Sequence, residues 1–126
     1  MQHRRYRLAA IVLFACFALP AHAAPLHIQN DVSACAAIQA RTVSRQADFV
    51  LADIAIDWHK PVGDCGCLSA LIQYRSEVSV GGGASNLQSG LLAVKRSEEK
   101  RLVLATEPGL IADSPVHLQF SCAPPL

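Results

Sequence analysis

Apolar and polar residues alternate over several short stretches of this chain, and the alternation predicts β-strands. From residue 49 to residue 59 every second side chain is apolar, and the side chains between them include two aspartates and a histidine. A period of two is typical of a strand that buries one face and exposes the other. Residues 68–80 and 116–122 alternate in a similar way. Three half-buried strands are therefore expected, each with its apolar side in a common core.

Shorter apolar stretches predict the remaining elements. Residues 26–29 and 34–43 supply one or two more strands, although the alanines of the second stretch also fit a short helix. Residues 91–96 and 101–107 are expected to form a hairpin around the turn Ser97–Lys100. Loops rich in glycine, proline or polar residues are expected at 60–64, 81–90 and 108–115.

Six or seven short strands separated by regularly spaced turns predict an all-β fold, an antiparallel β-sandwich of immunoglobulin-like type. A small closed β-barrel is the alternative, because it too is built from short alternating strands. In a sandwich, Trp58 on the apolar face of its strand is expected in the core beside a disulfide. The last residues, 123–126, are expected to form a loose tail.

The start of the chain has the three parts of a secretory signal peptide. Three arginines supply the positive charge that comes first, and the apolar run 8–19 follows them. Small residues then precede an expected cleavage after Ala23. The sequence therefore predicts a cleavable signal peptide, residues 1–23, and one disulfide-containing β domain, residues 24–126.

Two other interpretations of this N-terminus are less consistent with its residues. The first is a membrane anchor, but as a helix the apolar run would be about 18 Å long, whereas the hydrocarbon core of a membrane is about 30 Å thick. The second is a lipoprotein with lipid on Cys16, but its cleavage motif would need a small residue at the position of Phe14. Ordinary export with cleavage is therefore expected, and no integral membrane segment would remain after processing.

Removal of the signal peptide changes the charge of the chain. Eight of its eleven Lys and Arg residues would remain with all ten acidic residues, so the net charge would go from +1 to −2. The remaining basic residues form no cluster. Such a mildly acidic domain lacks the basic surface on which binding to nucleic acid or anionic lipid depends, and neither is expected as a partner.

Four cysteines would remain after cleavage: Cys35, Cys65, Cys67 and Cys122. An even number in an exported chain of this size predicts two disulfides. Three pairings are possible, and the sequence does not choose among them. A bridge between Cys65 and Cys67 would span about 6.6 Å in an extended strand, near the upper limit for a disulfide. Each of these two is therefore expected to pair with one of the distant cysteines.

The block Asp64–Cys67 is the sharpest chemical feature of the sequence, and two further hypotheses start from it. Two thiols around one glycine can act as a redox pair, although such a site normally uses a helix N-terminus or a nearby cation, and a strand follows here. Copper or zinc could be bound by Cys65, Cys67 and His59, but a C-x-C pair with one scattered histidine is an incomplete ligand set. Structural disulfides without metal or cofactor are the preferred interpretation.

Other polar residues give no catalytic constellation. Asp53 and Asp57 would lie about 13 Å apart along a strand, beyond the usual spacing of paired glycosidase carboxylates. Asp57 and His59 share a face, but no serine or cysteine nucleophile is placed with them. The glycine-rich segment 81–86 lacks the Lys-Ser/Thr end of a phosphate-binding loop. The acids and histidines are therefore interpreted as the solvated side of the strands.

The run from Asp64 to Leu71, with Tyr74 after it and Phe120–Cys122 near the end, resembles a family of small bacterial exported proteins of unknown function. The resemblance extends over most of residues 24–126 and implies a periplasmic setting. It implies no activity, and no catalytic residue is carried over from it.

These patterns predict an exported, periplasmic β-sandwich that is more consistent with a non-enzymatic binding or envelope accessory module than with an enzyme. Its partner would be a protein or another component of the envelope. The alternatives are a thiol-disulfide redox protein that uses Cys65 and Cys67, and a copper- or zinc-binding protein. Disulfide mapping of the exported protein would separate the three hypotheses.

Overall fold

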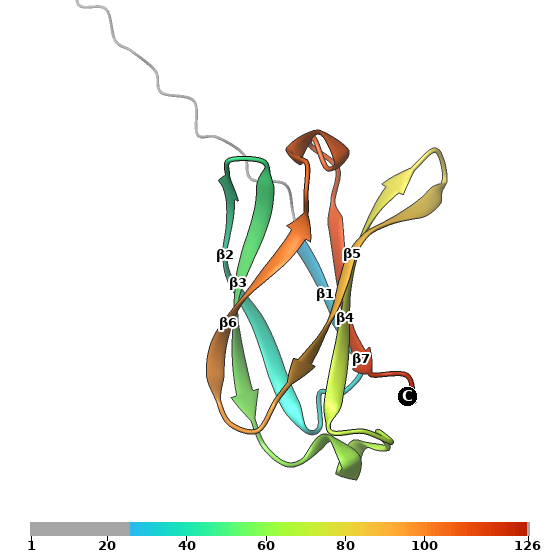
Figure 1. The fold of residues 1–126 in the computed structure, drawn as a ribbon. Coiled ribbons are helices and arrows are strands. Elements are labelled where there is room, and N and C mark those ends of the chain that lie inside the picture. Colours follow the sequence, from blue (N-terminus) through green and yellow to red (C-terminus); the bar gives the residue numbers. More distant parts are fainter. Residues whose placement is uncertain (1–25, 126) are drawn as a thin grey trace, which may run out of the picture.

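The computed structural model describes residues 26–125, which form a sandwich of two β-sheets (Figure 1). The strands, in chain order, are β1 Leu26–Asn30, β2 Ala36–Gln46, β3 Phe49–Trp58, β4 Leu71–Val80, β5 Gly83–Ala93, β6 Glu98–Ala105 and β7 Val116–Cys122. Two short 3₁₀ helices, η1 Val62–Cys65 and η2 Pro108–Leu110, lie in loops. In the described part of the chain, no helix is long and apolar enough to cross a membrane. The signal peptide expected at residues 1–23 lies outside the described residues.

Four strands form one sheet, in the order β1-β7-β4-β5, and three form the other, in the order β2-β3-β6. Neither sheet closes into a barrel, so the expected all-β sandwich is confirmed and the barrel alternative is wrong. The expectation of purely antiparallel pairing needs one correction, because β1 runs parallel to β7, with Leu26 opposite Val116. The rest of the domain separates these two strands in sequence, and so long a connection permits a parallel pair.

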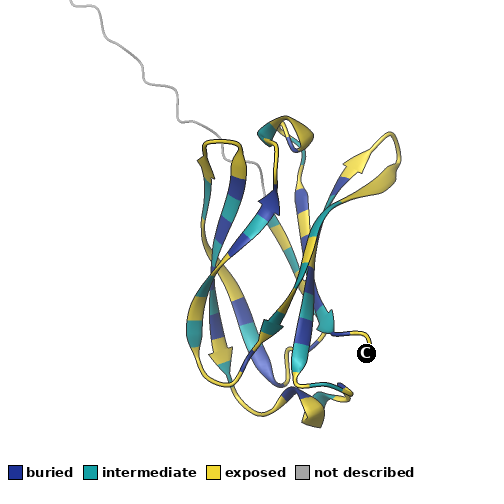
Figure 2. Cartoon of the chain, in the orientation of Figure 1, coloured by how far each residue is buried: buried dark blue, intermediate teal, exposed yellow. Residues whose placement is uncertain are grey.

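The core lies between the sheets and comes from the alternation that predicted the strands. The buried side chains of β3 are Val50, Ala52, Ile54 and Ile56, and those of β7 are Val116, Leu118 and Phe120. Both strands therefore have the inward face expected from the sequence (Figure 2). Trp58, at the end of β3, is only half-buried and packs against the margin of this core. The indole is therefore less enclosed than the sequence predicted.

The glycine-rich segment that was expected to be a loop is instead the turn and second strand of a hairpin. Gly81 and Gly82 have φ angles of 58° and 83°, the left-handed backbone that two-residue hairpin turns need. Strand β5 follows at once, with Gly83 opposite Val80, and pairs with β4 along its length. The first half of β5 has no apolar alternation, so its strand structure comes from this pairing. Figure 2 shows the tip of the hairpin as exposed.

The hairpin expected around Ser97–Lys100 is not formed. Strand β5 pairs with β4 in the four-stranded sheet, whereas β6 pairs with β3 in the three-stranded sheet, so the chain crosses between the sheets here. Strand β6 already begins at Glu98, inside the expected turn. A polar turn sequence is common to hairpins and to crossings. The pairing of β6 with β3, and not with β5, is what distinguishes the two.

Two further boundaries differ from the expectation. Residues 34–43 contribute a strand and not a helix, because β2 pairs with β3 from Ala36 to Gln46. Strand β4 begins at Leu71, later than the expected start at Leu68. Leu68 is 84% exposed, since it belongs to a disulfide-bonded segment that lies outside the sheet.

Candidate functional site

Both disulfides lie at one end of the sandwich, where β3 ends and β4 begins. One joins Cys35 to Cys65 and the other joins Cys67 to Cys122, with Cα–Cα distances of 6.2 Å and 5.1 Å. Each cysteine of the Cys-Gly-Cys pair thus reaches a distant partner, which is the arrangement that the sequence favoured. The segment between β3 and β4 is therefore fastened to the turn before β2 through Cys35 and to the end of β7 through Cys122.

The local sequence of this segment lets two neighbouring cysteines reach different partners. Pro61 precedes helix η1, and its carbonyl accepts a hydrogen bond of 3.0 Å from the backbone N–H of Asp64. Gly66 then has a φ angle of 88°, which turns the chain between Cys65 and Cys67. This left-handed backbone is costly for a residue with a side chain, and that explains the glycine between the two cysteines.

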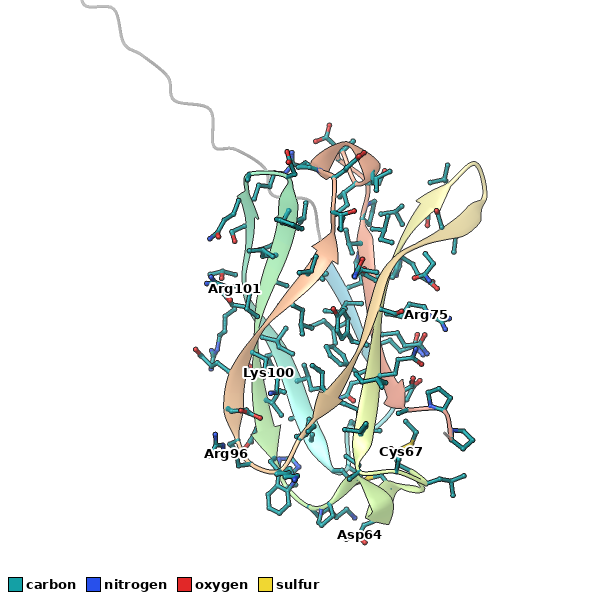
Figure 3. All side chains as sticks on the ribbon, in the orientation of Figure 1. Asp64, Cys67, Arg75, Arg96, Lys100 and Arg101 are labelled. Atoms are coloured by element: carbon teal, nitrogen blue, oxygen red, sulfur yellow. A yellow bond between two sulfur atoms is a disulfide. The ribbon has the colours of Figure 1, made fainter. Side chains whose placement is uncertain are left out.

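A pocket of about 500 Å³ opens at the same end of the molecule. It is enclosed by the end of β3, the segment that carries η1, the residues before β4 and the residues after β5. Its lining includes Trp58, Val62, Cys67, Leu68, Val94 and Lys95. Figure 3 shows Cys67 and Asp64 at this end of the sandwich. The volume lies within the range of small-ligand sites in proteins.

The pocket is predominantly apolar, and one of its side chains is unusually exposed. Val62 and Val94 are buried, whereas Leu68 is almost completely exposed to solvent. The disulfide at the adjacent Cys67 fastens the backbone that carries this leucine to the end of β7. A large apolar side chain beside an apolar pocket forms the kind of continuous patch that marks interaction sites in soluble proteins.

Within the described residues, the indole N–H of Trp58 has no hydrogen-bond partner. Its Nε1 atom is buried, and no acceptor in residues 26–125 bonds to it. The backbone N–H of the same residue is satisfied, because it donates to Oγ of Ser97 at 2.9 Å. Buried indole N–H groups are usually paired, and an unpaired one costs about 1–3 kcal/mol.

The charge at the pocket comes from Lys95, the one charged side chain among the described residues of the lining. Ser69 adds a hydroxyl, but its Oγ already accepts a hydrogen bond of 3.0 Å from the backbone N–H of Leu71. The site thus offers an apolar surface and one cation. An apolar group that carries a negative charge matches this set.

The metal hypothesis needs free thiols in the Cys-Gly-Cys pair, whereas the redox hypothesis needs a bridge that exchanges, and both cysteines are bonded to distant partners. The sulfurs of Cys65 and Cys67 are in different disulfides, so neither is available as a metal ligand in this state. Within the described part of the chain, no group of three or more His, Cys, Asp or Glu side chains is placed to hold a metal ion. His59 lies instead beside Asp57, with its Nε2 3.3 Å from the carboxylate.

The acidic residues considered for catalysis are engaged in ion pairs and do not line the pocket. Arg101 donates to both oxygens of Asp53, from Nε at 2.7 Å and from Nη2 at 3.1 Å. These bonds, together with one from Thr42, hold the pKa of the Asp53 carboxyl below its usual value. Asp57 accepts a hydrogen bond of 3.3 Å from Oγ of Ser97. Their surroundings agree with the solvated sheet face expected from the sequence.

Two features of this structure are absent from the sequence-based expectations. The pocket combines residues from three loops and strand ends, and the sequence had placed Val94 in a hairpin. The second feature is a pair of stacked histidine rings, His27 and His117, with centroids 5.3 Å apart. The parallel pairing of β1 and β7 sets these residues opposite each other. For the pocket, the sequence offered one indirect signal, the apolar character of the segments that surround it.

Comparison with known families gives a match over most of the chain. A family model described as "Uncharacterized protein conserved in bacteria (DUF2195)" matches residues 10–125. Searches of curated proteins and of solved structures each found no match. The matched region includes both disulfides and every residue of the pocket.

Proposed function

The chain belongs to this bacterial family of uncharacterized proteins, and we propose that it is an exported, non-enzymatic module that binds an apolar group of an envelope partner. The group would be a side chain of a partner protein, held in the pocket beside Cys67. No cofactor takes part in this function. The proposal has three parts, which concern location, binding and the lack of catalysis.

Export to the periplasm is supported by the chemistry of the chain. Two intramolecular disulfides suit a compartment outside the cytoplasm, because cytoplasmic thiols are kept reduced. The N-terminal arrangement of positive charge, apolar run and small residues supports a signal peptide of residues 1–23. The working protein would then be the single domain of residues 24–126.

Binding in the pocket rests on one observation, the almost fully exposed side chain of Leu68 beside an apolar pocket of about 500 Å³. An apolar group of a partner that fills the pocket would remove this leucine and the apolar lining from water. Lys95 would favour a group with a negative charge over a neutral one.

A non-enzymatic role is supported by the side chains that the pocket presents. Its charged group is one lysine, and its serine is already bonded to the backbone. The acidic residues with potential for acid-base chemistry, Asp53 and Asp57, are bonded to other side chains outside the pocket. Binding is therefore the activity for which the pocket is equipped.

The test uses the fluorescence of Trp58, the only tryptophan of the chain. The probe is 1-anilinonaphthalene-8-sulfonate, which has an apolar ring system and an anionic group. Bound in the pocket, it is expected to quench the emission of Trp58 by energy transfer at a stoichiometry of one per domain. Ala70→Phe, which puts a ring into the pocket from an exposed position, is expected to weaken this binding at least tenfold.

The matched control is Leu110→Phe, which adds a ring at an exposed leucine in η2, at the other end of the sandwich. This variant is expected to bind the probe as the wild type does. Circular dichroism of each variant checks that the probe meets a folded domain. A wild type that binds no probe, or an Ala70→Phe variant that binds it unchanged, would reject the pocket as the binding site.

A further inference from the structure

The edge strands of a β-sandwich have unpaired backbone groups, and such edges pair with other chains unless the sequence prevents it. The two sheets have four edges, which are β1 and β5 in one sheet and β2 and β6 in the other. Natural edges are protected by short length, by charged side chains, or by charges that point inward. Three of the four edges have such protection.

Each protected edge has a different feature that hinders pairing with another chain. Strand β1 has only five residues. Strand β2 carries Arg41 and Arg45. Strand β6 begins with four consecutive charged residues, and two of them, Glu98 and Lys100, form an ion pair of 3.3 Å on the side of the strand that also carries Leu102. Because Leu102 faces the core, these charges point inward at the edge of the sheet.

Strand β5 has none of these three features. A β-bulge at Leu87, another feature that protects edges, interrupts its pairing with β4, but the stretch from residue 88 to residue 93 pairs regularly. The eleven residues of the strand, Gly83–Ala93, include no charged residue and no proline. It pairs with β4 on one side, and none of its residues is fully buried. Leu91 is half-exposed, and it lies opposite Gln73 on the outer face of the sheet. Figure 1 shows the tip of the β4–β5 hairpin projecting sideways from the sandwich, and the second half of β5, which carries Leu91, has no described strand bonded to its free edge.

We propose that β5 pairs antiparallel with β5 of a second copy of this chain, so that the four-stranded sheets of the two copies become continuous. Pairing about a twofold axis places the same strand on both sides of the interface. Two arginine-bearing β2 edges would bring like charges together, which destabilises strand pairs. The uncharged β5 is the edge among the four best matched to its own copy.

The outer face of β5 adds an apolar contribution to this pairing. Ser89, Leu91 and Ala93 share that face by the alternation of the strand, and none of them carries charge. Pairing centred near Leu91 brings the leucines of the two copies side by side and removes both from water. The unpaired backbone groups of the two edges bond to each other in the same contact.

The test measures self-association of the mature domain by analytical ultracentrifugation over a range of protein concentrations. The wild type is expected to form a dimer as concentration rises. Ser89→Lys places a charge on the exposed face of β5 and is expected to raise the dissociation constant at least tenfold. Gln39→Lys places the same charge at an exposed position of β2 and is expected to leave the constant unchanged.

A wild type that stays monomeric over the whole range would overturn the proposal, and strands of other proteins would then be the candidates for this edge. Association that persists in Ser89→Lys would place the interface elsewhere and overturn it as well. Leu91→Lys is the second variant if Ser89→Lys fails to fold by circular dichroism. Hydrogen exchange of the wild type gives an independent readout, because amides of β5, and not those of β2, are expected to become protected with rising concentration.

Discussion

The ring of Tyr74 lies over Gly90, the residue directly opposite it on β5. A Cβ atom at position 90 would come within 2.5 Å of the Cε1 atom of Tyr74, closer than real side chains approach. Tyr74 is nearly buried, and its hydroxyl lies 3.5 Å from the carbonyl of Val103 on β6. The glycine thus makes room for a ring that extends from one sheet to the other.

Replacement of Gly90 by alanine is expected to lower the free energy of unfolding by about 1–3 kcal/mol, because the methyl group forces Tyr74 to move. Urea denaturation of the mature domain measures the change. Gly109→Ala is the control, since nothing lies within 4 Å of a Cβ there, and it is expected to change stability by less than about 0.5 kcal/mol. Equal effects at both positions would contradict the steric explanation.

Burial also raises the pKa of Tyr74 above its usual value of 10.0. Above that pH the unfolded chain loses the phenol proton before the folded chain does, so the free energy of unfolding is expected to fall until pH passes the folded-state pKa. Tyr74 is the only tyrosine after residue 23, so phenolate absorbance reports it directly. The titration midpoint is expected to drop when urea unfolds the domain. Identical midpoints in both states would refute this expectation.

A second contact between the sheets comes from Ser76, which is fully buried on β4. Its Oγ donates a hydrogen bond of 2.6 Å to the carbonyl of Leu104 on β6. Ser76→Val leaves that carbonyl unpaired and is expected to cost about 1–3 kcal/mol in urea denaturation. Ser79→Val, at an exposed position of the same strand, is expected to stay within about 0.5 kcal/mol of the wild type. Similar losses in both variants would show that valine, and not the lost bond, is responsible.

The sequence predicted the strands whose own residues alternate and missed those that depend on a partner. Ile54 and Phe120 were placed in the core correctly, because a period of two directly reports a half-buried strand. The start of β5 was missed because its polar residues become a strand only by pairing with β4. The crossing to β6 was read as a hairpin, since turn residues do not specify which sheet the next strand joins.

The candidate site was predictable only in its covalent part. The geometric difficulty of a bridge between residues two apart favoured a distant partner for each of Cys65 and Cys67, but it did not say which partner each would take. The pocket was not predictable, because Trp58, Leu68 and Val94 meet only after three separate segments have folded. An unpaired indole donor is likewise a property of the assembled structure and has no signature in the sequence.

Processing of the N-terminus gives a prediction that separates export from lipid anchoring. Protein recovered from the periplasmic fraction is expected to begin at Ala24, as read by N-terminal sequencing. Ala23→Phe puts a bulky residue at the cleavage position and is expected to leave the precursor uncut. Cys16→Ser is the control and is expected to change neither the location nor the new terminus. Membrane association that disappears in Cys16→Ser would show that the chain is a lipoprotein instead.

The disulfides are expected to act as crosslinks of the fold. In the chain-entropy estimate, removal of the Cys67–Cys122 bridge, with a sequence separation of 55, costs about 4 kcal/mol. Removal of the Cys35–Cys65 bridge, with a separation of 30, costs about 3.5 kcal/mol. Replacement of both cysteines of one bridge by alanine, followed by urea denaturation, measures each loss. Losses near zero would mean that the bridge serves another purpose.

Resistance to reduction distinguishes such crosslinks from a redox pair. Each bridge contains one buried cysteine, Cys35 or Cys67, which limits in-line attack by a thiolate. Reduced glutathione followed by alkylation and mass spectrometry is therefore expected to label no cysteine of the folded domain, and all four once urea has unfolded it. Labelling of Cys65 or Cys122, which are partly exposed, in a domain with unchanged circular dichroism would contradict this. Because Cys65 and Cys122 belong to different bridges, the labelled residue would also identify which bridge exchanges.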